Sequence, residues 1–161
     1  MTASWRFSAL ADRHRAVGSE LEDWSGMGTA WSYDKDQEEE HLDTFNRLLV
    51  ENDTRPTALL PLWNVMGYGL GVASALMGEK AAMACTIAVE QVIGEHYAKQ
   101  AETLDKKDDK LKSTLEKFRD DELDHLETGV QHDGENAPGY EIMKTIVQFG
   151  CRTAIKISEK I

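Results

Sequence analysis

Apolar side chains recur at helical spacing along most of this chain, with charged side chains at the positions between them. In the first such stretch, Leu42, Phe45 and Leu49 lie three or four residues apart and share one helix face. The alternation that indicates strands is nearly absent. The pattern predicts an all-α protein whose helices, joined by short links, form an antiparallel bundle. The predicted helices cover residues 31–50, 79–104, 111–129 and 139–161.

Residues 56–78 differ from the rest of the chain because they contain no charged side chain. A segment of this length is long enough to cross a bilayer, but the proline and glycines that interrupt it argue against a plain span. Trp63 and Tyr68 are amphipathic side chains of the kind found at the headgroup level of membranes. We expect an additional helix that lies in the membrane interface or lines an apolar entrance. The alternative is a glycine-rich helix buried in the bundle.

Composition narrows the function classes. The net charge of −11 argues against a nucleic-acid-binding protein, because phosphate contacts need a basic face. The 161 residues are enough for one domain with a sizeable core. Cys85 and Cys151 form neither a disulfide framework nor a zinc-binding spacing, which favours a reducing compartment. Residues 1–18 contain three arginines and one acid, a weak transit-peptide composition.

The candidate chemistry lies in a repeated signature, Glu38-x-x-His41 and Glu122-x-x-His125. Residues three apart lie on one helix face, so each copy directs a carboxylate and an imidazole to the same point. Two such helices, with one more glutamate from each of two others, form the di-iron carboxylate pattern of helix bundles. Glu90 suits a lone-glutamate position because it ends a long apolar run. Its charge would be costly to bury unless it is paired or bound to metal, and a protonated or arginine-paired glutamate is the alternative.

Carboxylate and imidazole donors with open coordination positions favour iron or manganese over a closed zinc site. Reduced iron in such a site can activate O₂ for hydroxylation, desaturation, iron oxidation or peroxide chemistry. His96 lies six residues after Glu90, on another helix face, and is expected to support the site or the structure. His14 and His132 receive no ligand role.

From Asp36 onward, five segments match the demethoxyubiquinone hydroxylases of coenzyme Q biosynthesis, and the chain resembles that family. The paired Glu-x-x-His signatures and the block ending at Glu90 are the most specific of these segments. The resemblance implies a ferritin-like di-iron helical domain over residues 36–161. It also implies two iron ions bound by Glu38, His41, Glu90, Glu122 and His125. The matching segments are residues 38–42, 55–63, 82–90, 118–125 and 150–152.

The same resemblance implies a monooxygenase that hydroxylates the ring of a polyprenylated benzoquinone with O₂ and NADH as electron donor. It implies peripheral attachment to the matrix side of the mitochondrial inner membrane and a lipid-binding partner protein of the ubiquinone biosynthesis complex. The uncharged residues 56–78 would then help a long-tailed quinone leave the bilayer. A homo-oligomer is left open by the sequence.

Residues 1–35 depart from the family pattern. In the family, an Asp-His-Ala-Gly-Glu box opens the first helix, and its glutamate binds iron. The spacing from Glu90 to Glu122, applied backward from Glu38, reaches position 6, where no glutamate stands. Glu20 and Glu22 lie too close to Glu38 for a full helix and turn. Loss of the ligand helix and an alternative or mispredicted exon both remain open.

Three functions therefore compete. The quinone hydroxylase is the leading hypothesis, although the missing glutamate predicts poor activity of this chain as written. A catalytically impaired relative could instead bind quinone or serve as a scaffold subunit of the ubiquinone biosynthesis complex. A ferritin-like iron-handling protein is disfavoured by the long uncharged segment.

Overall fold

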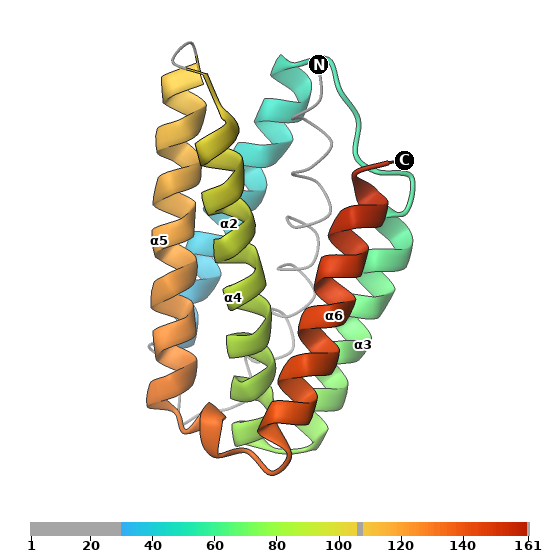
Figure 1. The fold of residues 1–161 in the computed structure, drawn as a ribbon, viewed down its shortest axis with the longest axis vertical. Coiled ribbons are helices and arrows are strands. Elements are labelled where there is room, and N and C mark those ends of the chain that lie inside the picture. Colours follow the sequence, from blue (N-terminus) through green and yellow to red (C-terminus); the bar gives the residue numbers. More distant parts are fainter. Residues whose placement is uncertain (1–29, 106–107, 161) are drawn as a thin grey trace. The chain divides into compact units, whose positions relative to one another are not determined.

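The computed structural model describes residues 30–105 and 108–160, and within them it contains helices and no strand. The all-α class predicted from the sequence is therefore confirmed. The part of the N-terminal segment that precedes residue 30, with Glu20 and Glu22, lies outside the described residues. The elements in chain order are α2 (Ala30–Glu51), α3 (Leu60–Leu76), α4 (Glu79–Thr103), α5 (Asp109–Gln131), the 3₁₀ helix η3 (Gly134–Asn136) and α6 (Tyr140–Ser158) (Figure 1).

The chain divides into two compact units. One unit comprises Met1–Leu76 with Arg152–Ile161, and the other comprises the continuous segment Met77–Cys151. We call them the split unit and the continuous unit. The continuous unit holds α4, α5, η3 and most of α6, and the split unit holds α2, α3 and the end of α6.

In the continuous unit, α4 and α5 pack side by side and run in opposite directions (Figure 1). Glycines set their close approach, because a Cβ added at Gly129 would lie 2.8 Å from Ile87 Cγ1. Further along the pair, a Cβ added at Gly94 would lie 4.0 Å from the Cβ of Glu122. The Tyr97 and Phe118 rings then meet with centroids 6.3 Å apart. These contacts fix the register of the two helices over several turns.

The connection from α5 to α6 closes one end of the continuous unit. Its core contains Ala84, Ile87, Ala137 and Tyr140. The turn before η3 depends on Asp133, whose φ of 63° lies in the left-handed region that Asp and Asn tolerate. Lys80 on α4 donates a hydrogen bond to Asp133 Oδ2 over 3.0 Å. That bond, with one from Asn136, lowers the pKa of the Asp133 carboxyl below 3.8.

A polar contact joins α4 to α6 in the same unit: Gln148 Nε2 donates to Gln91 Oε1 over 2.9 Å. Elsewhere α6 exposes apolar side chains at Ile142, Ile146 and Phe149. These residues lie four and three positions apart, so they form a stripe along one helix face. We call them the α6 stripe.

In the split unit, α2 buries Leu42, Phe45 and Leu49, the apolar positions that predicted this helix. The helix ends where Asn52 Nδ2 donates to the carbonyl oxygen of Leu48 over 2.8 Å. Asp53 follows with a φ of 49°, which turns the chain away from the helix direction. The predicted break after residue 50 is therefore present, one residue later.

The additional helix expected in the uncharged segment is present as α3, which runs without a break from Leu60 to Leu76. Pro61 lies in the first turn, where its missing N–H breaks no helical hydrogen bond. Trp63 Nε1 donates to Ser158 Oγ at the end of α6 over 2.8 Å. Among the described helices, none combines the length and apolar character that a transmembrane span requires.

The surface of α3 contradicts a fully buried helix. Gly67 and Ser74 are its buried residues, whereas Val65 exposes 71% of its surface and Met66 54%. The alternative of a glycine-rich helix buried inside the bundle is therefore wrong, and α3 presents apolar side chains outward.

Candidate metal centre

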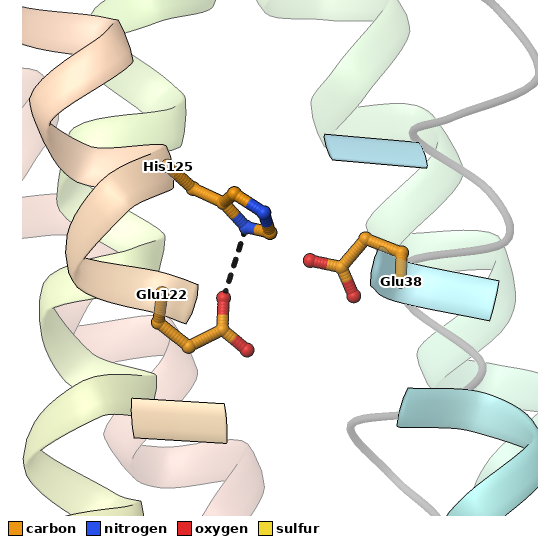
Figure 2. A group of neighbouring side chains, drawn as sticks. All are labelled: Glu38, Glu122 and His125. Carbon is orange, nitrogen blue, oxygen red and sulfur yellow. Dashed lines mark ion pairs between the residues drawn. The ribbon is translucent and has the colours of Figure 1, made fainter. Parts of the chain in front are cut away.

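The second Glu-x-x-His signature lies on α5 in the middle of the continuous unit. Glu122 is 0% exposed and His125 is 3% exposed. Residues three apart share a helix face, and His125 Nδ1 lies 3.3 Å from Glu122 Oε2 (Figure 2). A carboxylate and an imidazole, two potential metal ligands, therefore converge at one buried point, as the spacing of three residues predicts.

Glu90 lies on the face of α4 that packs against α5. Ile87 and Gly94, one turn before and after it on the same face, contact α5 at Gly129 and at Glu122. In an antiparallel pair with this register, Glu90 is level with the turn of α5 that carries His125. Glu90 is only 7% exposed, which agrees with the inward orientation that its apolar neighbours predict.

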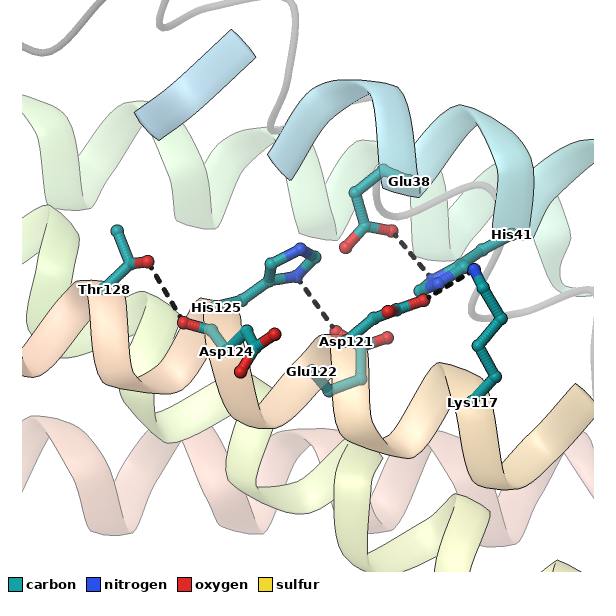
Figure 3. Close-up of polar contacts among 8 residues, drawn as sticks. All are labelled: Glu38, His41, Lys117, Asp121, Glu122, Asp124, His125 and Thr128. Atoms are coloured by element: carbon teal, nitrogen blue, oxygen red, sulfur yellow. Dashed lines mark hydrogen bonds and ion pairs between the residues drawn. The ribbon is translucent and has the colours of Figure 1, made fainter. Parts of the chain in front are cut away.

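The first signature, on α2 of the split unit, repeats the geometry of the second. His41 Nδ1 lies 3.7 Å from Glu38 Oε2, and the His41 side chain is 1% exposed (Figure 3). Each unit thus contains a carboxylate and an imidazole that converge on one helix face. The equivalence of the two copies follows from their identical spacing.

The donor set fits a divalent metal ion. Within the continuous unit, two buried carboxylates and one buried imidazole occupy facing turns of two packed helices. Buried carboxylates are costly unless they are paired or coordinate metal, and a cation offsets their mutual repulsion. Oxygen and nitrogen donors of this kind suit iron or manganese, whereas structural zinc sites are usually closed by cysteine.

Comparison with known proteins supplies the family. The family model described as ubiquinone biosynthesis protein COQ7 matches residues 21–158, which include both signatures and Glu90. The chain belongs to the COQ7 family. The resemblance found from the sequence motifs is therefore confirmed. The family match begins inside the segment 1–35, so the proposed boundary at residue 36 stays a prediction.

Several curated relatives are named as demethoxyubiquinone or demethoxyubiquinol hydroxylases. The chain is 49% identical over 130 residues to the human "NADPH-dependent 3-demethoxyubiquinone 3-hydroxylase, mitochondrial", covering 78% of this chain and 60% of that protein. A Caenorhabditis elegans protein of the same name is 44% identical over 94% of this chain and 83% of its own length. The Rhodospirillum rubrum "3-demethoxyubiquinol 3-hydroxylase" is 42% identical, over 78% of this chain and 59% of that protein. The chain thus spans about three fifths of the human and bacterial proteins.

One contact beside the ligand pair was not anticipated from the sequence of this COQ7-family chain. Lys117 Nζ lies 3.0 Å from Asp121 Oδ2, and the Asp121 side chain is only 12% exposed (Figure 3). The signal was available in principle, because Lys117 and Asp121 are four residues apart on a predicted helix. Charged residues at this spacing are usually solvated, however, and burial distinguishes this pair.

The remaining histidines hold other positions. His96 Nε2 lies 3.0 Å from Gln100 Nε2 on the same helix, in agreement with a supporting role for His96. His132 Nδ1 lies 3.9 Å from Glu79 Oε1 at the α4–α5 end of the continuous unit, away from the ligand pair in sequence. His14 lies outside the described residues.

Proposed function

We propose that this chain is a di-iron monooxygenase that hydroxylates the ring of a demethoxylated, polyprenylated benzoquinone in ubiquinone biosynthesis. The observation that carries the proposal is the buried Glu122–His125 pair facing the α4 turn of Glu90, in a chain of the COQ7 family. The names of the human and bacterial relatives, both demethoxyubiquinone-type hydroxylases, support the substrate class.

In this proposal, the two signatures and Glu90 bind two iron ions together. Glu122 and His125 bind from α5, Glu90 from α4, and Glu38 and His41 from α2. The carboxylates balance the charge of the cations, and the buried side chains around them exclude water that would compete for the metal. Iron held in this way supplies O₂ activation, which the protein side chains cannot provide themselves.

The overall reaction replaces one ring C–H bond with C–OH. One oxygen atom of O₂ enters the ring and the other leaves as water, with two electrons from a reduced nicotinamide and one additional proton. NADH is the donor expected from the sequence resemblance, whereas the human relative is named for NADPH. An assay with each nucleotide separately decides between them.

The direct test is turnover of demethoxyubiquinone by the purified, iron-loaded chain, with the hydroxylated quinone measured by mass spectrometry. Glu90→Gln should lower bound iron and turnover together, by at least about tenfold for loss of a ligand carboxylate. Glu102→Gln makes the same change at an exposed position on α4 and should leave both unchanged. Wild-type iron content in Glu90→Gln would remove Glu90 from the site.

A second function is favoured by one observation: positions 5–8 hold Trp, Arg, Phe and Ser where the family pattern expects a glutamate ligand. In that case the chain binds quinone, or supports the ubiquinone biosynthesis complex, without efficient turnover. Iron content and product formation separate the two functions. A hydroxylase binds iron and forms product, whereas an impaired relative binds substrate and forms product poorly even when iron is supplied in excess.

We further propose that the chain is a mitochondrial protein attached peripherally to the inner membrane through α3. The mitochondrial names of relatives and the outward apolar side chains of α3 support this location. Val65→Asp should weaken binding to liposomes by about tenfold or more, because it places a charge on the membrane-facing surface. Val50→Asp changes another exposed valine, at the end of α2, and should bind as wild type does. Equal binding by both variants would exclude α3 as the attachment surface.

The α6 stripe supports the lipid-binding partner protein implied by the family resemblance. Exposed apolar patches on soluble domains commonly mark protein or membrane contacts. Ile146→Glu at the centre of the stripe should abolish capture of the purified partner while leaving the melting temperature unchanged. Capture at the wild-type level would assign the partner to another surface.

A further inference from the structure

Lys117 and Asp121 form a salt bridge on α5 immediately before the ligand pair. The ammonium and carboxylate groups are 3.0 Å apart, and the Lys117 ammonium also lies 5.4 Å from the centroid of the buried Phe118 ring. The salt bridge therefore joins a half-exposed cation to an acid that is largely buried. The ring contact favours the position of the ammonium over the face of Phe118.

The position of Asp121 on the helix makes it a potential ligand. Asp121, Glu122 and His125 lie within about 100° of arc around α5, and His125 is one turn after Asp121 on nearly the same line. A carboxylate at Asp121 could therefore turn toward a cation held by Glu122 and His125. Lys117 lies one turn away in the opposite direction along the helix, about 6 Å before Asp121 along the axis. The salt bridge therefore directs the Asp121 carboxylate toward Lys117 and away from the His125 turn.

We propose that Lys117 is a positioning residue that holds the Asp121 carboxylate outside the set of metal ligands. This inference rests on the proposed metal centre. By engaging Asp121, Lys117 would keep this carboxylate from joining Glu122 and His125 as a ligand, and would thereby leave a bound metal accessible to O₂. Lys117 also balances one negative charge beside the buried carboxylates and thereby stabilises the metal-free protein.

The test uses Co²⁺ as a spectroscopic probe of the full chain, because its visible absorption weakens as its coordination number rises. Lys117→Met keeps most of the side-chain stem and removes the charge. We expect this variant to bind Co²⁺ about fivefold more tightly, with weaker visible absorption, because the released carboxylate joins the metal. The metal-free variant should melt at a lower temperature than the wild type. Lys117→Arg should restore the wild-type absorption and melting temperature.

Two further variants separate positioning from general charge effects. Lys110→Met removes a charge from an exposed position on the same helix and should leave the Co²⁺ spectrum unchanged. The double variant Lys117→Met with Asp121→Asn should regain the wild-type spectrum, because the competing carboxylate is absent.

Three outcomes contradict the inference. A Lys117→Met spectrum and affinity equal to those of Lys110→Met would show that Lys117 does not control the ligand set. A changed spectrum in Asp121→Asn alone, a variant that can be measured even if Lys117→Met does not fold, would show that Asp121 already binds the metal. Failure of the wild-type chain to bind Co²⁺ would overturn the metal centre itself, and this inference with it.

Discussion

Gly129 determines how closely α5 approaches α4 one turn beyond His125. A Cβ added at Gly129 would collide with Ile87 at 2.8 Å, whereas one added at Gly94 would lie 4.0 Å from the Glu122 Cβ, an ordinary van der Waals distance. This close approach brings the Glu90 turn of α4 level with the turn of α5 that carries His125. Glycine is unfavourable inside a helix, so its presence at Gly129 has a packing reason.

Gly129→Ala should destabilise the protein by about 1–3 kcal/mol, because the new methyl group would lie 2.8 Å from Ile87 Cγ1 and 3.3 Å from the Met83 carbonyl oxygen. Gly150→Ala is the matched control. Its added Cβ meets no heavy atom of the described chain within 4 Å, so helix propensity should stabilise it by up to about 1 kcal/mol. Urea unfolding of both variants measures the difference, and equal stabilities would exclude a tight helix contact at Gly129.

For individual residues, the sequence predicted the features that depend on a single helix. The convergence of Glu122 with His125 and of Glu38 with His41 follows from a spacing of three residues, and the burial of Glu90 follows from the apolar run before it. The Gly94 contact could not be predicted, because it depends on which turn of α5 faces α4. The buried state of Asp121 was missed for the same reason.

Among the elements, the turn between α5 and η3 is held by the bond from Lys80 to Asp133. The pKa of the Asp133 carboxyl is lowered below 3.8, chiefly by the Lys80 hydrogen bond, so the charged form is favoured in the folded state. A carboxyl whose folded pKa is depressed stabilises the fold above its unfolded pKa. That contribution is lost as the pH falls through the folded pKa.

Asp133→Asn should therefore lower the melting temperature at pH 7 by about 2 °C, the size expected for loss of an exposed ion pair. Asparagine tolerates the left-handed backbone of this position, so the substitution tests the charge and not the turn. The difference from wild type should shrink as the pH falls below 3.8, the unperturbed value. A difference that is constant with pH would show that the Lys80 contact is not its cause.

The apolar periodicity of the sequence predicts the helix boundaries closely. The helices predicted over 31–50 and 79–104 correspond to Ala30–Glu51 and Glu79–Thr103, because their apolar periodicity is sustained and polar turns end them. The glycines of α3 do not interrupt it, and the backbone continues as one helix from Leu60 to Leu76. Glycine lowers helix propensity by about 1 kcal/mol per residue, which apolar contacts along a helix can outweigh.

For the whole molecule, metal binding should be measurable as an increase in the melting temperature. A ligand that binds only the folded chain stabilises it by about 2.7 kcal/mol at a hundredfold excess over its Kd, which raises the melting temperature of a chain of this size by about 5–10 °C. We expect Fe²⁺, added without oxygen, to produce this increase in the wild type and a much smaller one in His125→Ala. A chelator should reverse it. Equal increases in both proteins would place iron binding elsewhere.

The division of the chain into a continuous and a split unit has a consequence for synthesis on the ribosome. The segment Met77–Cys151 is complete, with Glu90, Glu122 and His125, before the last residues of the chain are made. The split unit cannot fold completely until Arg152–Ile161 has been synthesised, because it includes that segment and the hydrogen bond from Trp63 to Ser158. Under the proposed function, a nascent chain would therefore hold three of the candidate metal ligands before the split unit can fold. The timing of iron delivery relative to release of the chain would then decide whether the Glu90 and Glu122 carboxylates first meet a metal ion or only each other.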